Sequence, residues 1–273
     1  MDRSSRSDQP RSSQRLWLLA GTGEGPALAR CLLERGWHLR VSVVSPSASH
    51  PFPDHPHLEM RVGALAGATA IRHELEDAER QGAGFRWLID ASHPFATRVT
   101  AAAVAASQGQ TTRLLRLRRP QLSAPTASLL SRLDDLAAQL RGGERILLAI
   151  GSRHLAEACR QCAGSLPHAR VLPHPQAIRQ ALQAGLAAQR IACLRPTPQG
   201  EVERALCRHW RVDTIVCRQS GGATEANWQR IAAADGQRLL LLKRPEEPAG
   251  IPQLGFADLV ELVGWPDRNG DGD

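Results

Sequence analysis

The first stretch that decides the fold is LWLLAGTGEG, residues 16–25, in which an apolar run of strand length meets a glycine-rich turn. Apolar side chains then recur at helical spacing over residues 26–35, and this pattern stops at Gly36. The order of strand, glycine turn and helix is typical of a parallel α/β unit. In such a turn the backbone can approach a phosphate, and the N-terminus of the helix supplies N–H donors.

The spacing of the glycine turn is G-x-G-x-G, because Pro26 stands where the dinucleotide-binding fingerprint has its last glycine. Enzymes that use S-adenosylmethionine have similar turns, and a glycine turn without a ligand is a further alternative. In dinucleotide sites an acidic residue about 20 residues further on holds a ribose hydroxyl. Here the corresponding turn begins at Ser45 and continues with Pro46 and Ser47, without a carboxylate, which favours NADP over NAD.

The alternation of short apolar strand and helix repeats along the chain and implies parallel β-α-β units. It is interrupted between residues 118 and 127, where Pro120 and Pro125 flank a stretch without a clear period. The predicted strands are 16–20, 39–44, 87–91, 112–117, 145–150, 169–172, 190–194, 214–218 and 238–242. The predicted helices are 26–35, 64–79, 95–107, 154–163, 176–184, 201–210, 223–234 and 256–263.

We place a domain boundary at this interruption and predict an α/β fold of two Rossmann-like lobes with mainly parallel sheets and a cleft between them. The N-terminal lobe covers residues 16–120, and the C-terminal lobe covers residues 121–265. Residues 1–15 form a disordered tail and residues 266–273 a flexible tail, because both segments are polar and have no apolar core.

The composition is that of an ordinary globular protein, with 273 residues, 42% hydrophobic and 22% charged. The net charge of +7 favours anionic partners such as phosphates, polycarboxylates or nucleic acid. Tyrosine is absent and aromatic residues make up 4%, which argues against a stacking surface for single-stranded nucleic acid. No apolar run approaches the roughly 18 residues that cross a bilayer, so we expect no membrane partner and a cytoplasmic location.

The cysteine pattern gives little support to a metal site. Of the six cysteines, only Cys159 and Cys162 have a paired spacing. Zinc would need a second such pair, or histidines at ligand spacing. The histidine- and proline-rich stretch at residues 50–57 favours an extended loop without a fixed ligand geometry. We therefore predict reduced cysteines, as in a cytosolic protein, and no bound metal.

A second informative loop reads DASHPF, residues 90–95, and again ends a predicted strand and opens a helix. Ser92 can cap that helix, and Pro94 suits its first turn. The imidazole of His93 titrates near neutral pH and could deliver a proton. The alternative is that Asp90, Ser92 and His93 only satisfy backbone groups around the cap.

Two loops of the second lobe have the same strand-to-helix position. One reads QSGGATE, residues 219–225, and the other is the shorter Gly151-Ser152-Arg153. Ligands of open parallel sheets bind where such loops meet helix N-termini. Four loops of this kind on two lobes indicate one cleft that holds a large anionic ligand, or two ligands.

Arginines cluster just before the predicted domain boundary, at Arg113, Arg116, Arg118 and Arg119. In an extended segment Arg116 and Arg118 share a face, while Arg119 points the other way. Guanidinium groups at the edge of a cleft would bind carboxylates through paired hydrogen bonds. A solvated edge strand that is protected by its charge explains the same cluster equally well.

Taken in order, these loops resemble those of the precorrin-6A reductase family of cobalamin biosynthesis, including its cobalt-precorrin-6A branch. The resemblance extends from about residue 16 to residue 245, and residues 90–96 are its most specific part. It is carried by residues 18–25 (LLAGTGEG), 90–96 (DASHPFA), 115–120 (LRLRRP), 151–153 (GSR), 172–173 (LP), 220–222 (SGG) and 244–245 (RP).

The resemblance implies two lobes that hold a nicotinamide cofactor, usually NADPH with NADH possible, and hydride transfer to one double bond of a polycarboxylate corrin precursor. His93 is our candidate for the catalytic proton donor. The candidate cofactor-binding residues are Gly21, Thr22, Gly23, Glu24, Ser45, Ser220, Gly221, Gly222 and Thr224. The candidate substrate-binding residues are Ser92, Arg116, Arg118, Arg119, Gly151, Ser152 and Arg153.

Two other functions stay open. A methyltransferase that uses S-adenosylmethionine on a related ring would also suit the glycine turn, although the missing acid after the second strand counts against it. A nucleic-acid-binding protein would suit the positive charge, but no helix-turn-helix or zinc signature supports it. We expect a monomer or a small homo-oligomer without nucleic-acid partners.

Overall fold

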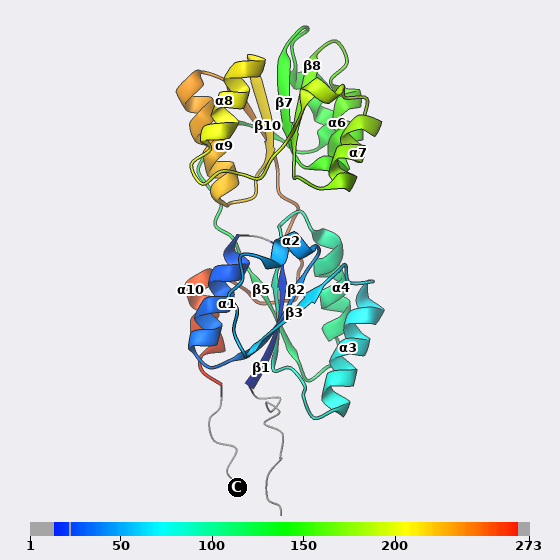
Figure 1. Ribbon diagram of the computed structural model, residues 1–273, viewed down its shortest axis with the longest axis vertical. Coiled ribbons are helices and arrows are strands. Elements are labelled where there is room, and N and C mark those ends of the chain that lie inside the picture. Colours follow the sequence, from blue (N-terminus) through cyan, green and yellow to red (C-terminus); the bar gives the residue numbers. More distant parts are fainter. Residues whose placement is uncertain (1–13, 22, 267–273) are drawn as a thin grey trace, which may run out of the picture. The chain divides into compact units, whose positions relative to one another are not determined.

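The computed structural model describes residues 14–21 and 23–266, and the chain divides into two compact units. Unit 1 comprises the described residues up to Arg119 and from Pro245 onward, and unit 2 is Pro120–Arg244. Each unit is a parallel sheet with helices on both faces (Figure 1). The predicted α/β class with two parallel sheets is confirmed. The predicted tails lie outside the described residues except for Gln14, Arg15, which already belongs to the first strand, and Pro266.

The sheet of unit 1 has the strand order β12-β5-β4-β1-β2-β3, and all adjacent strands are parallel. Helices α1 and α10 lie on one face and α3 and α4 on the other (Figure 1). The strands are β1 (Arg15–Ala20), β2 (His38–Val43), β3 (Leu58–Val62), β4 (Trp87–Ala91), β5 (Arg113–Leu117) and β12 (Gln253–Leu254). The helices are α1 (Glu24–Glu34), α2 (Pro46–Ser49), α3 (Ala68–Arg80), α4 (Thr97–Ser107) and α10 (Phe256–Val263).

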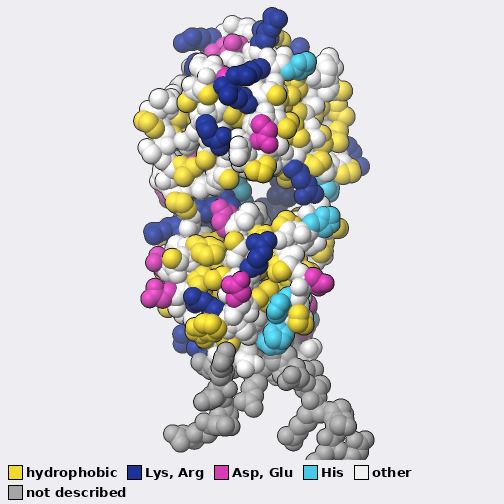
Figure 2. Space-filling model, turned by 60° about the vertical axis from the view of Figure 1, so that its left-hand side comes forward, with side chains coloured by type: hydrophobic (Ala, Val, Ile, Leu, Met, Phe, Trp, Pro, Cys, Tyr) yellow, Lys and Arg dark blue, Asp and Glu magenta, His cyan; other side chains and the backbone are white. Residues whose placement is uncertain are grey.

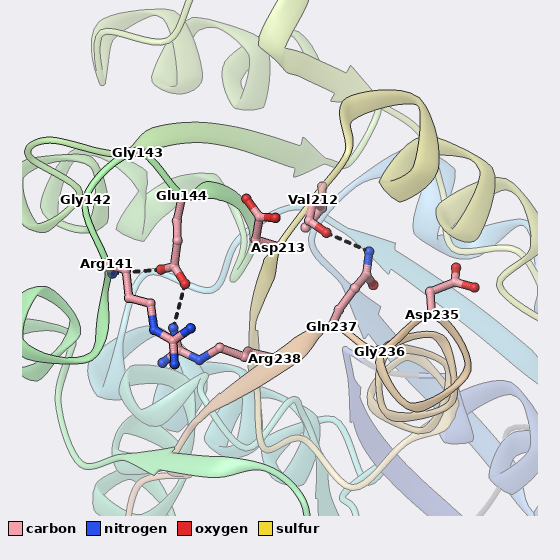
Figure 3. A pocket seen from close by; sticks show the side chains of 10 residues that line it. All are labelled: Arg141, Gly142, Gly143, Glu144, Val212, Asp213, Asp235, Gly236, Gln237 and Arg238. Atoms are coloured by element: carbon pink, nitrogen blue, oxygen red, sulfur yellow. Dashed lines mark hydrogen bonds and ion pairs between the residues drawn. The ribbon is translucent and has the colours of Figure 1, made fainter.

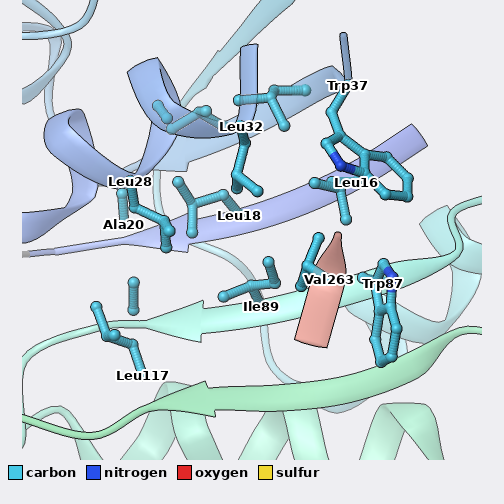
Figure 4. Packing of buried hydrophobic residues seen from close by; sticks show 14 of the residues in the cluster. Leu16, Leu18, Ala20, Leu28, Leu32, Trp37, Trp87, Ile89, Leu117 and Val263 are labelled. Carbon is cyan, nitrogen blue, oxygen red and sulfur yellow. The ribbon is translucent and has the colours of Figure 1, made fainter. Parts of the chain in front are cut away.

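β1 lies between β2 and β4, and helices cover both faces of the sheet there, so its residues 16–20 form an unbroken apolar run. Leu16 and Leu18 face α1, where Leu28 and Leu32 pack on them (Figure 4), and Trp17 belongs to the core of the opposite face. All five are completely buried. Burying one such leucine contributes about 1.5–3 kcal/mol, so this central strand fixes the position of the glycine turn that follows it.

The residues after Pro245 return to unit 1, so the predicted lobe at residues 121–265 is wrong at its C-terminal end. β12 adds a strand beside β5, and α10 buries an apolar face against the same core as α1. The indole of Trp37 donates to the carbonyl oxygen of Gly264 at 3.0 Å and holds the end of α10 in place. A strand of two residues has no periodic pattern, and the apolar face of a helix does not reveal which sheet it covers.

The sheet of unit 2 has the order β6-β11-β10-β7-β8-β9 and is also parallel. Helices α8 and α9 lie on one face and α6 and α7 on the other (Figure 1). The strands are β6 (Ser128–Leu130), β7 (Arg145–Ala149), β8 (Leu166–Val171), β9 (Ile191–Cys193), β10 (Thr214–Arg218) and β11 (Arg238–Leu242). The helices are η2 (Leu133–Asp135), α5 (Leu136–Gln139), η3 (Ser152–His154), α6 (Leu155–Gln161), α7 (Pro175–Gln183), η4 (Ala188–Arg190), α8 (Glu201–Trp210) and α9 (Ala223–Asp235).

Several properties of the described residues bear on possible metal, membrane and nucleic-acid binding. Within residues 14–21 and 23–266, no helix has the length and apolarity to span a membrane, and no cluster of three or more His, Cys, Asp or Glu side chains could hold a metal. Burial raises the pKa of the thiols of Cys162 and Cys207 to about 12, so both stay protonated near neutral pH. On the face shown in Figure 2, basic side chains are interspersed with acidic and apolar ones.

Candidate active site

In each sheet there is one pair of neighbouring strands whose following helices lie on opposite faces of the sheet. In unit 1 this pair is β1 and β4, because α1 and α4 cover opposite faces. In unit 2 it is β7 and β10, which lead into α6 and α9 (Figure 1). Open parallel sheets bind ligands at such switch points, beyond the carboxyl ends of the strands. All four predicted ligand loops follow these four strands.

The loop after β1 places glycines at the N-terminus of α1. Gly23 is the N-cap residue and makes no side-chain cap, and a β-carbon added to it would meet no atom within 4 Å. Gly21 adjoins the loop after β4, because a β-carbon there would lie 3.4 Å from the backbone nitrogen of His93 and from the α-carbon of Ser92. The structure therefore brings two predicted loops together, with room for an anion at the start of α1. Thr22 lies outside the described residues.

Glu24 begins α1, and its carboxylate forms an ion pair with the guanidinium of Arg119. Arg119 is buried, with 8% of its surface exposed. A carboxylate in this first turn would repel a bound phosphate, and the arginine offsets that repulsion. The two residues, one predicted for the cofactor and the other for the substrate, thus contact each other.

A buried ionic network holds the loop after β4. Asp90 is completely buried, and its Oδ1 accepts the backbone N–H of Ser92 at 2.9 Å while Oδ2 accepts from Arg116 Nη1 at 2.5 Å. Arg116 also donates to Thr100 Oγ1 at 2.8 Å and, through Nε, to Glu247 at 2.5 Å. Only 3% of Arg116 is exposed. Arg116 therefore holds Asp90, and through Asp90 the backbone of the Ser92 loop, in position.

The imidazole of His93 is oriented by its own turn. Its Nδ1 accepts the backbone N–H of Phe95 at 3.2 Å, so the neutral ring carries its proton on Nε2. The backbone N–H of Ala96 donates to the carbonyl oxygen of His93 at 2.7 Å and closes the turn. These two hydrogen bonds set both the tautomer and the orientation of the neutral imidazole.

The prediction that Ser92 caps the following helix is wrong. α4 begins at Thr97 with Ala96 as its N-cap, because the turn at residues 93–96 satisfies its own backbone first. The Ser92 hydroxyl lies 3.4 Å from Thr100 Oγ1, inside the fold. The contact of Asp90 with the Ser92 amide and that of His93 with the Phe95 amide agree with the structural alternative that the sequence left open.

Ser45 occupies the N-cap position of α2, two residues after the end of β2, which is the neighbour of β1. Its hydroxyl lies 3.2 Å from that of Ser47. The turn thus carries hydroxyl groups at the carboxyl edge of the unit 1 sheet.

In contrast to the buried Arg116 and Arg119, Arg118 is exposed at the end of β5.

The loop after β7 in unit 2 begins with Gly151, whose φ of +82° suits glycine. The guanidinium of Arg218, the last residue of β10, lies across this glycine: a β-carbon at Gly151 would lie 3.1 Å from Arg218 Nη2 and 3.4 Å from Cζ. Ser152 and Arg153 follow in η3, and Arg153 is exposed. Arg218 was not predicted as a site residue. Its position at the end of a strand, before a glycine loop, was the available signal.

One backbone amide of the loop after β10 is bound by a side chain of the helix that follows. The backbone N–H of Gly221 donates to Glu225 Oε2 at 2.6 Å, so a carboxylate of α9 occupies an amide that was predicted to contact the cofactor. Gly222 is the N-cap residue of α9, and Thr224 lies half-buried in its first turn. Ser220 is buried. Binding of the cofactor by this loop stays a prediction.

A hollow of about 530 Å³ lies at the amino edge of the unit 2 sheet, opposite the predicted loops (Figure 3). Several of its charges are engaged by neighbouring side chains. Glu144 accepts from Arg238 at 2.7 Å, and hydrogen bonds from Arg204 and Arg208 lower the pKa of Asp235. A hollow of about 380 Å³ at the amino edge of unit 1 likewise contains none of the predicted site residues. The carboxyl edges are therefore the better candidate sites.

Comparison with known proteins gives a consistent result. The family model described as precorrin-6x reductase CbiJ/CobK matches residues 15–266. A cobalt-precorrin-6A reductase of Synechocystis is 32% identical over 243 residues, which cover 86% of this chain and 90% of that protein. A precorrin-6A reductase of Mycobacterium tuberculosis is 32% identical over 262 residues, which cover 93% of this chain and 99% of that protein.

A solved structure described as CobK precorrin-6A reductase has the same fold. The TM-score is 0.73 at 23% sequence identity, and the alignment covers 93% of this chain and 99% of that one. The likeness extends over both units and supports the arrangement of strands and helices within each of them.

Proposed function

The chain belongs to the precorrin-6x reductase family, and on this premise we propose that it transfers a hydride from NADPH to one carbon–carbon double bond of precorrin-6A or cobalt-precorrin-6A. The product is the dihydro macrocycle, so the enzyme is an oxidoreductase of cobalamin biosynthesis that acts on a CH–CH group. One observation carries the assignment of the site: the glycine turn after β1 and the Ser92–His93 loop after β4 adjoin at the switch point of unit 1.

The glycine turn fits the phosphates of a dinucleotide. Gly23 leaves the N-terminus of α1 without a side-chain cap and with open space, and the Arg119 ion pair offsets the charge of Glu24. We infer that Gly21, Thr22 and Gly23 hold the phosphates through backbone N–H groups. Bound there, NADPH would supply the hydride, and the protein would orient it and exclude water.

We infer a preference for NADPH over NADH from the turn after β2. Ser45 and Ser47 offer hydroxyl groups where NAD sites commonly place a carboxylate that binds the ribose 2′-hydroxyl. Such a carboxylate would repel the 2′-phosphate of NADPH, and Ser45 does not. In unit 2, we infer that Ser220, Gly222 and Thr224 bind further anionic groups of the ligands, while Gly221 supports the turn.

The substrate carries several carboxylates, and exposed arginines at the carboxyl edges of the sheets suit them. Arg118 follows β5 and Arg153 follows β7, and both are exposed. A guanidinium binds a carboxylate through two parallel hydrogen bonds. We infer that Ser92, Gly151 and Ser152 line the substrate site. The buried Arg116 and Arg119 act as positioning residues, because their guanidinium groups already bind carboxylates inside unit 1.

Reduction of the double bond requires a proton as well as a hydride. We infer that His93 donates this proton from Nε2 in its imidazolium form, because a neutral imidazole does not release its Nε2 proton. Protonation at Nδ1 then replaces the hydrogen bond from the Phe95 amide, and solvent restores the transferred proton. Asp90 and Arg116 hold the backbone of the same loop and so set the position of the imidazole. The family match gives no support to the methyltransferase alternative, and we do not propose it further.

The His93→Ala variant tests this assignment. We expect kcat for NADPH-dependent reduction of cobalt-precorrin-6A, measured without oxygen, to fall at least about tenfold, since a positioned general acid typically contributes more than that. NADPH affinity should change little. The matched control is His73→Ala on α3, whose side chain is 69% exposed and pairs with Asp77. Unchanged turnover in His93→Ala would remove His93 from the mechanism, whereas a wild-type enzyme that leaves NADPH unoxidised would contradict the function itself.

A further inference from the structure

The carboxyl edge of unit 2 holds a cluster of basic groups at the switch point between β7 and β10. β7 and β10 are hydrogen-bonded neighbours, with Cys217 paired to Ala149 at their carboxyl ends. Arg153 and His154 lie in η3, which follows β7. Arg218 is the last residue of β10, directly before the loop that follows this strand. Three basic side chains thus come from two adjacent strand ends, at the edge where parallel sheets bind ligands.

The backbone is shaped to accept the guanidinium of Arg218. Gly151 has a φ of +82° and no side chain, and the guanidinium packs against it, since a β-carbon there would lie only 3.1 Å from Nη2. A larger residue at this position would crowd the guanidinium by a few tenths of an ångström and would also adopt an unfavourable backbone conformation. Glycine at position 151 therefore lets Arg218 pack directly on the backbone of this loop.

The cluster holds positive charges near one another. Burial and the positive charge of Arg153 both act against the charged form of Arg218 and lower its pKa to about 10. Arg218 and Arg153 also lower the pKa of the His154 imidazole, after the larger effect of burial, whereas Glu157, 3.9 Å away, raises it. Holding these like charges near one another is unfavourable in the ligand-free protein, and a bound anion would reverse that.

We propose that Arg218 and Arg153 form an oxyanion subsite at the β7–β10 switch point, which takes a phosphate of the dinucleotide or a carboxylate of the tetrapyrrole. Gly151 provides the space for Arg218, and η3 begins directly beside it. The subsite deepens the proposed reductase function and rests on it for the identity of the ligand. Arg218 becomes a ligand-binding residue in addition to those predicted from the sequence.

The test compares Arg218→Gln with wild type, Arg218→Lys and Arg160→Gln. Arg160 is an exposed residue in the last turn of α6, outside the proposed site, and its replacement removes the same charge from unit 2. The measurements are the Kd of NADPH and of NADH by quenching of tryptophan fluorescence, and KM and kcat for cobalt-precorrin-6A. Loss of a charged hydrogen bond in Arg218→Gln should weaken one ligand about tenfold to a hundredfold. Arg218→Lys should recover part of the loss, and Arg160→Gln should match wild type.

The pattern of losses identifies the anion. Weaker binding of NADPH alone assigns the 2′-phosphate, weaker binding of both dinucleotides assigns the pyrophosphate, and a higher KM for the tetrapyrrole with unchanged kcat assigns a substrate carboxylate. Constants within twofold of wild type for all three ligands, in a variant that unfolds at the wild-type temperature, would overturn the subsite. If wild type binds neither dinucleotide, the proposed function fails instead. The subsite is then judged with inorganic pyrophosphate by calorimetry, where equal affinity in wild type and Arg218→Gln contradicts it.

Discussion

Replacing Gly221 with alanine is expected to destabilise unit 2 by about 2–6 kcal/mol, because overpacking and left-handed backbone strain each cost about 1–3 kcal/mol. A β-carbon at Gly221 would overlap the carbonyl oxygen of Pro120 and lie 2.5 Å from Arg244 Nη2, and the φ of +71° adds the strain. Arg244 itself donates to the Pro120 carbonyl at 3.1 Å, so the segments that begin and end unit 2 meet at this glycine. Denaturant unfolding followed by circular dichroism measures the loss.

The matched control is Gly236→Ala, at the end of α9 in the same unit. Gly236 has nearly the same φ, +68°, but a β-carbon there would meet no atom within 4 Å. The control therefore isolates the backbone strain, which costs about 1–2 kcal/mol. Equal losses in the two variants would show that close packing at Gly221 contributes nothing.

Replacing Arg116 with methionine should destabilise unit 1 by about 3–5 kcal/mol, because it leaves a buried carboxylate without its counter-charge. Asp90 is 0% exposed and accepts from Arg116 at 2.5 Å. Its other oxygen holds the Ser92 amide, so the position of the following loop and of His93 should also be disturbed. We expect turnover to fall with stability, and the fall should persist at temperatures where the variant is still folded.

Two comparisons separate the ionic effect from the loss of packing. In the double variant Asp90→Asn/Arg116→Met, part of the lost stability should return, since the unpaired charge is gone. Arg118→Met, two residues along the chain and exposed, should cost less than about 0.5 kcal/mol. A single variant Arg116→Met as stable as Arg118→Met would contradict the account of the buried network.

The fold could be predicted from the sequence where strands lie in the middle of a sheet. β1 is buried on both faces and therefore reads as five apolar residues before a glycine, which is a strong signal. The strands that the sequence did not reveal are β3, β6 and β12, and each lies at the edge of its sheet. Edge strands bury less surface, and β12 has only two residues, so little pattern is available to detect them.

The loops of the candidate site could be predicted from the sequence, but the partners of their side chains could not. Parallel topology places the loops after β1 and β4 side by side, and the structure shows Gly21 next to Ser92 and His93. The partner of Arg116 could not be found in the same way, because Glu247 lies 131 positions away in a segment that returns from the other unit. A sequence does not show which of its arginines bind carboxylates inside the fold.

The surroundings of Arg218 could not be predicted from the sequence either. Its sequence neighbours indicate only a strand end before a glycine loop, whereas its surroundings depend on Gly151, far away in the chain. The contrast between Arg116, which two carboxylates surround, and Arg218, which lies near Arg153, emerges only when the strands are assembled. Charge type alone therefore predicts an anion site less well than the neighbours of each charge.

The central claim is that this chain passes a hydride from NADPH directly to the tetrapyrrole. The most direct measurement is the mass of the product formed without oxygen from cobalt-precorrin-6A and NADPH that carries deuterium at the transferred position of the nicotinamide. The account predicts a product that contains one deuterium with labelled cofactor in ordinary water. A reduced product without the label, or no reduction by the wild-type enzyme with either cobalt-precorrin-6A or precorrin-6A, would contradict it.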